Sequence, residues 1–291
     1  MLKKFLLGGL LLFLPFSVNA LEFKEDTVVT QHGFSMSYDK YYMLSERLYD
    51  VTIDNLPIDT LEILVSDNLT HIAGDSKNVV SNYYYDENGN VEKISHYNVG
   101  DKEFNIALTN DNKLTRDVVN NKSYETSYKV VTVDAFMYND IDEGICYFLI
   151  EMSNSWKKTP SVKSYDVIAT RWTGSSVTVF DANGGQYCES PVNYSYMGDN
   201  MVKKSNGLGI SMNFVDSCTV PQMVLYVYAH GNFGTVFGTY QHATRTVSLS
   251  QSKSYNFAST GLGGVLDFTN NTVESYYDDM SGVKIVTRLN S

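Results

Sequence analysis

Two serine–lysine pairs have the spacing of a nucleophile and its general base. Ser37-Tyr-Asp-Lys40 and Ser250-Gln-Ser-Lys253 each place the lysine after the serine with two residues between them. Enzymes that use this pair also carry a Lys-Thr-Gly segment, whereas this chain has only Lys158-Thr-Pro160. The first pair also falls on a predicted surface helix. We therefore expect neither pair to be catalytic.

The histidines, which could bind zinc or act as general bases, show no metal-binding spacing. The sequence has no His-x-His or His-Glu-x-x-His segment, so a zinc site would have to be assembled from distant positions. Cys146 lies in the apolar run Ile145–Ile150, where we expect it to be buried on a strand face and unreactive. These patterns predict no catalytic residue, no metal ligand and no cofactor. A hydrolase whose site the linear sequence does not reveal remains an alternative.

Carboxylates gather in two turns where they could bind calcium. The segment Asp86–Asn90 matches the first half of a calcium-binding loop, but Val91 stands where that loop needs glycine. We interpret this segment as the turn of a β-hairpin with Asn88-Gly89 at its tip. The second turn contains the carboxylates of Asp140, Asp142 and Glu143. Calcium at the second turn is left open, with a solvated acidic turn as the favoured interpretation.

Tyr240, Gln241 and His242 form a short polar group at the predicted end of a strand. They follow Gly238, where a loop between two sheets would present polar side chains. His242 has no second titratable residue near it in the sequence, which argues against a chemical role. We predict a structural role, in which these side chains bind backbone groups at the edge of a sheet.

The cysteines allow one disulfide. The chain contains 3 cysteines, so at most one pair can form. Cys188 and Cys218 lie in loop-like segments with proline close by, where a bridge that closes about thirty residues is sterically easy. We predict a disulfide between Cys188 and Cys218, with Cys146 free.

Residues 1–20 have the pattern of a secretory signal peptide. Lys3 and Lys4 precede the apolar run Phe5–Val18, and small residues end at Ala20. The run is too short to span a bilayer comfortably, so we expect cleavage after Ala20, a secreted protein and no stable membrane insertion. The chain has 33 acidic against 22 basic residues, a balance that disfavours nucleic acid as a partner.

Apolar periodicity predicts a mainly β protein with a small helical unit. Residues 21–75 show the three- and four-residue spacings of two short helices, with Ser35 or Ser37 as a cap. Residues 76–135 form a middle region that contains the hairpin. Residues 136–291 hold about eight or nine short strands separated by turn signals, which predicts an antiparallel β-sandwich.

The predicted centre of the sandwich is the segment Gln222–Ser250. Met223–Ala229 is almost continuously apolar, as in a strand that is covered on both faces. His230–Asn232 and Gly238 interrupt the run and are interpreted as turns. Thr246–Ser250 then alternates small polar with apolar residues, which predicts a half-solvated strand.

Several short segments resemble a known group of proteins. Gly238–Thr244 and Val247–Ser250, together with Trp156–Pro160 and Ser164–Ile168, resemble uncharacterised exported proteins of low-GC Gram-positive bacteria. The resemblance covers roughly the last half of the chain. It implies export from a Gram-positive cell and paired short helices before a C-terminal β domain, and it implies no particular activity.

Together these patterns predict a secreted, non-enzymatic binding protein whose unidentified ligand lies outside the cell or in the cell envelope. Tyrosines next to Asn and Ser suit contacts with sugars or proteins, and packing in the sandwich is the favoured role of each single ring. One alternative is a pore-forming protein, because Ser- and Thr-rich alternating residues between Thr235 and Phe257 could form a membrane hairpin.

Overall fold

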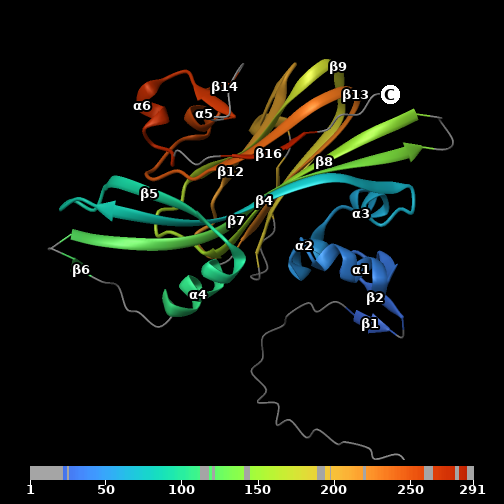
Figure 1. Ribbon diagram of the computed structural model, residues 1–291, viewed down its shortest axis with the longest axis horizontal. Helices are drawn as coiled ribbons and strands as arrows, with labels where there is room; N and C mark the ends of the chain where they lie inside the picture. The colour runs from blue at the N-terminus through green and yellow to red at the C-terminus, as the bar shows by residue number, and fades with distance from the viewer. Residues whose placement is uncertain are drawn as a thin grey trace, which may run out of the picture.

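The computed structural model describes most of the chain beyond the predicted signal peptide. The described residues are 22–24, 26–111, 118–119, 122–140, 145–188, 194–196, 198–218, 221–258, 265–278 and 282–286. Residues 1–20 lie outside them, as do Asp142 and Glu143 of the acidic turn. Within the described ranges the chain is mainly β, as the sequence predicts (Figure 1).

Long antiparallel strands form the main sheet. Its longest members are β4 (Leu69–Tyr85), β7 (Lys122–Asp140), β8 (Ile145–Lys158), β9 (Tyr165–Tyr187) and β13 (Gln222–Gln241). The shorter members are β5 (Val91–Val99), β6 (Val118–Val119), β10 (Tyr194–Tyr196), β11 (Met201–Lys204, after the 3-10 turn Gly198–Asn200), β12 (Gly207–Asn213) and β16 (Val283–Val286). The strand order is β11-β12-β9-β13-β8-β7-β4-β5, with β10 beside β9, β16 beside β13 and β6 beside β7.

The sheet forms two layers because β9 and β13 belong to both. The first half of β13, Gln222–Ala229, pairs with β8 on one side and with the second half of β9 on the other. The second half of β13 pairs with the first half of β9 and with β16. Register shifts in the middle of the β9–β13 pair mark the corner, where bulged strands pass from one layer to the other. The predicted sandwich is thus a single sheet folded over on itself.

The prediction of turns at His230–Asn232 and Gly238 is wrong, because both lie inside β13. Gly231 has a φ of 122°, and a Cβ there would lie 2.3 Å from the carbonyl oxygen of Ser176. A Cβ on Gly238 would lie 2.3 Å from Sδ of Met152. Gly231 therefore allows a bulge in the strand, and Gly238 allows a neighbouring side chain to approach the backbone closely. Neither glycine reverses the direction of the chain.

The space between the two layers holds the main hydrophobic core. Val131, Ile150 and Leu225 come from the layer of β7, β8 and the first half of β13. Side chains from the opposite layer complete it, among them Ile168, Ile210, Val236 and Ile285. Burial of each such side chain contributes about 1.5–3 kcal/mol to folding. The core thus fixes the positions of the strands that carry the candidate sites.

A helical cover, residues 38–64, packs on the outer face of the layer that contains β8. It consists of α1 (Tyr38–Ser45), α2 (Asp50–Asn55) and α3 (Ile58–Leu64), and it follows a small sheet of β1 (Glu22–Lys24), β2 (Thr27–Val29) and β3 (Ser35–Ser37). Leu44, Ile53 and Leu61 pack in one cluster with sheet residues Leu149 and Tyr226. Burial against the sheet stabilises helices that are too short to persist alone.

The sequence predicted two helices here, whereas residues 38–64 form three. Tyr49 has an extended backbone and separates α1 from α2, and Pro57 stands immediately before α3. Ser37 caps α1 as predicted, by accepting a hydrogen bond from the Lys40 N–H at 3.4 Å. Ser37 and Lys40 thus have roles in helix capping, and Lys40 also pairs with the exposed Asp67.

The middle region of the chain belongs to the main sheet. β4 and β5 form the predicted hairpin, and Gly89 takes a φ of 81° at its turn. A helix that the sequence did not predict, α4 (Asp101–Asp111), follows β5. Phe104 is its one buried side chain, so no apolar stripe marks it. The division expected at residue 136 falls within β7, which pairs with β4 and β8.

A C-terminal cover, residues 243–258 and 265–278, packs on the outer face of the other layer. Its described elements are α5 (Leu249–Ser252), β14 (Tyr255–Phe257), β15 (Leu266–Phe268) and α6 (Asn271–Glu274). Val167 and Ala169 of β9 pack against Val247 and Tyr255 of this cover. Figure 1 shows it in red at the opposite end of the molecule from α1, α2 and α3.

The prediction of a strand at Thr246–Ser250 is wrong. Ser248 caps α5 through a capping box with Gln251, in which each side chain bonds to the backbone of the other residue. Alternating Ser and apolar residues therefore reflect a capped turn of helix, in which the serine side chain satisfies free N–H groups. Ser250 lies in this helix, and Lys253 follows it and bonds to the backbone of Asp199.

Candidate functional site

The group Tyr240-Gln241-His242 lies in the interior of the protein, at the end of β13. Tyr240 and His242 are fully buried, and Gln241 is nearly so. The Tyr240 hydroxyl donates a hydrogen bond to the carboxylate of Asp166 on β9 and accepts one from Nε1 of Trp156 at 3.1 Å. The predicted edge position is wrong, because the C-terminal cover lies over the strand end.

Two buried carboxylates flank His242. The Asp166 carboxylate accepts hydrogen bonds from Nδ1 of His242 at 2.9 Å and from the Ala243 N–H at 2.8 Å. The Asp278 carboxylate accepts one from the His242 N–H at 2.5 Å and forms an ion pair with Lys129 at 2.7 Å. Lys129, Asp166, Tyr240, His242 and Asp278 are called the interior polar cluster below.

Electrostatics within the interior polar cluster favour a charged pair. Burial by itself raises the pKa of the Asp278 carboxyl, but Lys129, together with His96 and His242, lowers that pKa below its usual value. The Lys129 ammonium also lies 5.0 Å from the ring centre of Trp156 and 5.2 Å from that of Tyr240, where the ring faces attract a cation. The cluster thus compensates the cost of burying a charge.

The interior polar cluster is closed to solvent. Every one of its side chains is fully buried, and aromatic rings of Tyr83, Trp156 and Phe214 surround His242 at ring-centre distances of 5.6–6.1 Å. Nε2 of His242 has no hydrogen-bond partner among the described residues. A His–Asp pair could activate a nucleophile, but a substrate cannot reach this one. The geometry is that of a brace, which joins β7, β9 and β13 to the C-terminal cover.

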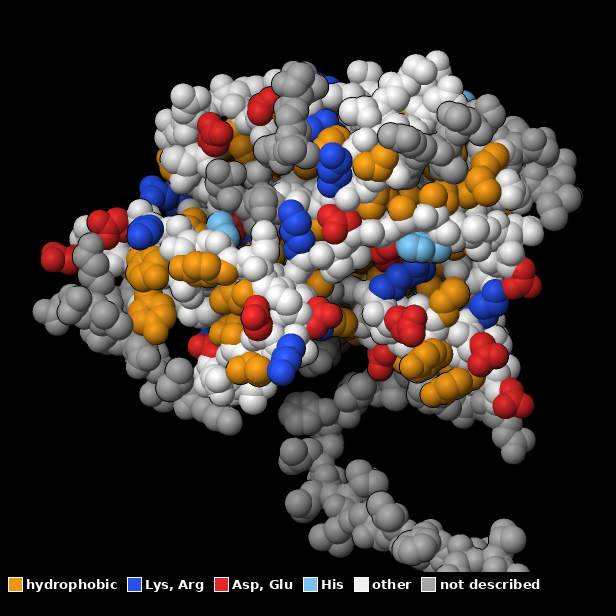
Figure 2. All heavy atoms as spheres, viewed as in Figure 1, with side chains coloured by type: hydrophobic (Ala, Val, Ile, Leu, Met, Phe, Trp, Pro, Cys, Tyr) orange, Lys and Arg blue, Asp and Glu red, His pale blue; other side chains and the backbone are white. Residues whose placement is uncertain are grey.

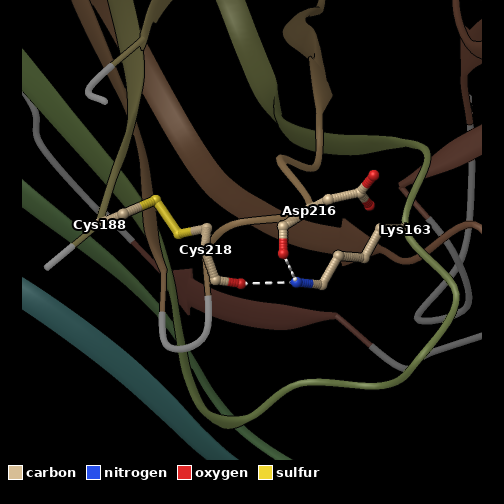
Figure 3. Close-up of a disulfide and its surroundings, with 4 residues drawn as sticks. All are labelled: Lys163, Cys188, Asp216 and Cys218. Atoms are coloured by element: carbon tan, nitrogen blue, oxygen red, sulfur yellow. Dashed lines mark hydrogen bonds between the residues drawn. A yellow bond between two sulfur atoms is a disulfide. The ribbon is translucent and has the colours of Figure 1, made fainter. Parts of the chain in front are cut away.

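The disulfide joins Cys188 to Cys218, the pair favoured by the sequence (Figure 3). The two Cα atoms lie 5.6 Å apart, within the normal range for a disulfide. Nζ of Lys163 donates hydrogen bonds to the backbone carbonyls of Asp216 and Cys218, at 2.7 and 2.8 Å. Figure 3 shows the Asp216 carboxylate pointing away from this ammonium. The disulfide and Lys163 together hold the loop that leads into β13.

Cys146 is free and only partly buried, which corrects its predicted place in the core. It pairs with Asn139 near the end of the β7–β8 hairpin. Ile150 on the same strand belongs to the main hydrophobic core, whereas Cys146 does not. Burial nevertheless raises the pKa of the Cys146 thiol. A raised pKa makes the thiol less reactive at neutral pH.

The two candidate calcium turns differ in what the structure describes. At the hairpin turn, Oδ1 of Asp86 accepts hydrogen bonds from the N–H groups of Asn88 and Asn90, at 2.9 and 2.8 Å. This carboxylate therefore serves the turn itself. The side chains of Asp140, Asp142 and Glu143 lie outside the described residues. Across the part of the chain that is described, no three His, Cys, Asp or Glu side chains come together as a metal site.

The helices that the structure describes are short, with 4 to 11 residues each. Within the described ranges, no helix is both long and apolar enough to cross a membrane.

An aromatic pocket opens between α3 and the layer that contains β8. It has a volume of about 320 Å³, and its wall consists of Ile63, Tyr138, Tyr147, Phe148, Leu149, Phe180 and Tyr228. These residues, which come from α3, β7, β8, β9 and β13, are called the aromatic pocket below. The Phe180 side chain is 51% exposed, which is unusual for a phenylalanine in a large sheet. The pocket is the concave, apolar and accessible feature that small ligands use.

Strand pairing explains how the rings come together. Tyr138 is paired with Tyr147 across β7 and β8, and Leu149 is paired with Tyr228 across β8 and β13. Paired residues point to the same face of a sheet, so these side chains share one wall. Phe180 is the extra residue of the bulge at which Tyr228 pairs with Asp181. Its ring centre lies 4.9 Å from that of Tyr147 and 6.3 Å from that of Tyr228.

Carboxylates and polar groups surround Tyr228 at the pocket. Its hydroxyl donates a hydrogen bond to Thr60 of α3 at 3.2 Å, and Thr60 also accepts one from the Asn183 amide at 3.1 Å. Burial raises the pKa of Tyr228 to about 12, and the neighbouring carboxylates of Asp59 and Asp181 add to the rise. Asp59 stands four residues before Ile63, on the same side of α3. No Lys, Arg or His is among the residues that form the pocket wall.

No protein-family model matches this chain, and no curated protein is significantly similar to it. Function is therefore inferred from the geometry of the chain itself.

Two other features of the surface are less enclosed or less apolar than the aromatic pocket. A second pocket of about 380 Å³ is lined by Trp172, Val177, Thr178, Val179, Lys203, Lys204 and Ser205. Lys203 there donates a hydrogen bond to the Val179 carbonyl at 2.8 Å, so part of its lining is already engaged. Figure 2 also shows hydrophobic side chains gathered over the end of the sheet near β5 and α4. Exposed side chains there include Tyr97 and Ile106.

The sequence does not reveal the aromatic pocket. Other tyrosines of the chain, among them Tyr83, Tyr85, Tyr187 and Tyr277, are buried and serve packing. A usable signal was present in Tyr147 and Phe148, next to Cys146 in an apolar strand. The partners Ile63, Phe180 and Tyr228 are far away in the sequence, and only the fold brings them to this strand.

Proposed function

We propose that this chain is an exported, non-catalytic binding protein, and that its ligand enters the aromatic pocket. The observation that carries the proposal is the exposed ring of Phe180 in a concave wall of other aromatic side chains. Aromatic rings provide a large contact area at a low entropic cost, which is why they dominate binding sites. Burial in the core does not explain a phenylalanine that is half exposed to solvent, and exposed apolar side chains in a concave wall are typical of binding sites.

The arrangement of titratable groups supports binding over catalysis. The His–Asp pair of the interior polar cluster is fully buried, so it is closed to any substrate. The wall of the aromatic pocket has tyrosine hydroxyls as its polar groups and contains no His, Cys, Asp or Glu. General acid–base catalysis needs such a group within hydrogen-bond reach of the substrate.

Export is part of the proposal. The residues that support it are the predicted signal peptide, residues 1–20, and the disulfide between Cys188 and Cys218. Disulfides form and persist in oxidising compartments outside the cytosol. We infer cleavage after Ala20 and a ligand in the cell envelope or outside the cell.

Pore formation has less support. The segment that motivates it starts in the second half of β13, which pairs with β9 and β16 on its two sides. It then passes into α5 and the C-terminal cover. Release of a membrane hairpin would require the loss of both strand pairings and of the cover.

Co-sedimentation tests the proposed function. The chain without residues 1–20 is mixed with purified Gram-positive cell walls and with insoluble polysaccharides, and the bound fraction is measured for wild type, Phe180→Ala and Tyr97→Ala. Tyr97 is the matched control, because its ring is 50% exposed and lies outside the pocket. We expect Phe180→Ala to weaken adsorption at least about tenfold, as loss of an aromatic anchor does, and Tyr97→Ala to have no effect.

Three results would contradict the proposal: no adsorption of wild type to any of these materials, equal losses in both variants, or a loss confined to Tyr97→Ala. A parallel assay on dye-loaded liposomes separates the pore alternative. Dye release by wild type would favour pore formation over binding.

A further inference from the structure

We propose that the aromatic pocket binds a quaternary ammonium group of the choline type. The inference rests on the proposed function, since it names the ligand class of the same site. It follows from the combination of aromatic rings with acidic neighbours and from the lack of basic residues in the wall.

The rings of the wall come from four strands. Tyr138 and Tyr147 come from the β7–β8 pair, Phe180 comes from the bulge in β9, and Tyr228 comes from β13. The ring planes of Tyr147 and Phe180 are inclined by 59°, and those of Phe180 and Tyr228 by 45°. Rings at these inclinations do not form the single flat stacking platform that a sugar needs, whereas a cation can approach any exposed ring face.

The chemistry of the wall favours a bulky cation. The faces of aromatic rings are electronegative and attract cations within about 6 Å of the ring centre. A trimethylammonium group cannot donate hydrogen bonds and offers methyl groups to the rings, so it suits a wall whose free polar atoms are few. A primary ammonium is more strongly hydrated and would lose more hydrogen bonds to water on entering this apolar wall.

Electrostatics add a preference for positive charge. Asp181 is paired with Tyr228, and Asp59 lies on α3 beside Ile63, so two carboxylates border the pocket. Figure 2 shows further acidic side chains over the helical cover, and the whole chain has a formal charge of −11. Such a field concentrates cations and repels anions.

Other features of the fold support no comparable ligand. The interior polar cluster is closed, and the pocket lined by Lys203 and Lys204 has a basic residue already bonded to the backbone. At the interface of the helical cover, Nε of Arg47 lies 3.6 Å from the carboxylate of Glu151, and burial encloses this carboxylate and raises its pKa.

Proton NMR provides a direct test. Choline chloride is titrated with the chain lacking residues 1–20, and the N-methyl resonance is followed. Ring faces shift the protons above them upfield, so we expect a saturable upfield shift. The neutral carbon analogue 3,3-dimethyl-1-butanol has nearly the same shape and lacks the charge. It should bind at least about fivefold more weakly, because the cation–π attraction is lost.

Two variants separate charge from shape. Phe180→Leu keeps an apolar side chain and removes the ring, so it should weaken choline binding about fivefold and leave the analogue nearly unchanged. Asp181→Asn should weaken choline binding about twofold to threefold, with no effect on the analogue. Tyr97→Ala, outside the pocket, should change neither.

Equal affinities for choline and its neutral analogue would overturn the inference, and so would the absence of any saturable shift. Tighter binding of Nε-trimethyllysine than of choline would also overturn it, because the site would then fit a modified protein side chain. These outcomes are distinct from failure of the proposed function. If adsorption to cell walls depends on Phe180 while choline does not bind, only the ligand class is wrong.

Discussion

The interior polar cluster and the aromatic pocket are built from similar side chains, yet they differ in access to solvent. Both use aromatic side chains from β9 or β13, and carboxylates lie within the cluster and near Tyr228 at the border of the pocket. In the cluster, Asp278 is paired with Lys129 and no side chain reaches solvent. In the pocket, Phe180 is half exposed and no basic side chain lines the wall. The ammonium of Lys129 supplies the positive charge inside the cluster. The wall of the aromatic pocket has no such cation of its own and is open to solvent, from which a cationic ligand could enter.

The largest expected effect comes from removing the internal cation. Lys129→Met leaves the Asp278 carboxylate buried without its partner, and we expect the free energy of unfolding to fall by about 3–5 kcal/mol. Urea denaturation at pH 7 measures it. The double variant Lys129→Met/Asp278→Leu removes both charges, so its free energy of unfolding should fall by less than that of the single variant. A loss below about 1 kcal/mol in Lys129→Met would show that the pair is not a brace.

Removal of the disulfide should have the second-largest effect on stability. The double variant Cys188→Ser/Cys218→Ser should lose about 3 kcal/mol of stability, because the unfolded chain is no longer cross-linked over 30 residues. Cys146→Ser is the control, and its partly buried side chain should contribute less than about 1 kcal/mol. Peptide mapping without reductant should recover Cys146 as a free thiol. Cys146 in a mixed disulfide would show that the pairing is incorrect.

His242→Ala should have a smaller effect. It removes the hydrogen bond from Nδ1 to Asp166 but retains the one from the Ala243 N–H, so we expect a loss of about 2 kcal/mol. Gln241→Ala is the neighbouring control, because the Gln241 side chain is also buried but does not belong to the interior polar cluster. It should cost less than about 1 kcal/mol. Similar losses in the two variants would contradict a specific role of the imidazole.

Phe180→Ala should change stability least. Its half-exposed ring contributes little to the core, so the free energy of unfolding should stay within about 0.5 kcal/mol of wild type. A loss above about 2 kcal/mol would mean that the ring of Phe180 packs in the fold and is not an exposed contact for a ligand.

Much of the fold could be predicted from the sequence, because local signals agree with it. The hairpin at Asn88-Gly89, the cap at Ser37 and the mainly β pattern all follow from turn, capping and alternation rules. The interpretation failed where long-range contacts override local signals. Gly231 is a signal for a turn in isolation, yet close packing against Ser176 makes it a bulge inside one long strand. Ser248 alternates like a strand residue, yet it caps α5.

The two sites could be predicted only in part. The sequence predicts a structural role for His242, but its partners are far away in the sequence: Asp166 by 76 residues and Asp278 by 36. No spacing rule connects positions so distant. The exposure of Phe180 depends on a register shift between β9 and β13, which alternation alone does not encode. Pairing at the level of the sheet therefore decides which ring is buried and which is free to bind.

The most direct test compares His242→Ala and Phe180→Ala in the same two assays. Thermal melts report stability, and the N-methyl shift of choline reports binding. The account predicts a lower melting temperature with choline affinity retained for His242→Ala, and an unchanged melting temperature with choline affinity lost for Phe180→Ala. An unchanged melting temperature with lost binding in His242→Ala would contradict it, because the buried cluster would then be the site and the aromatic pocket would not.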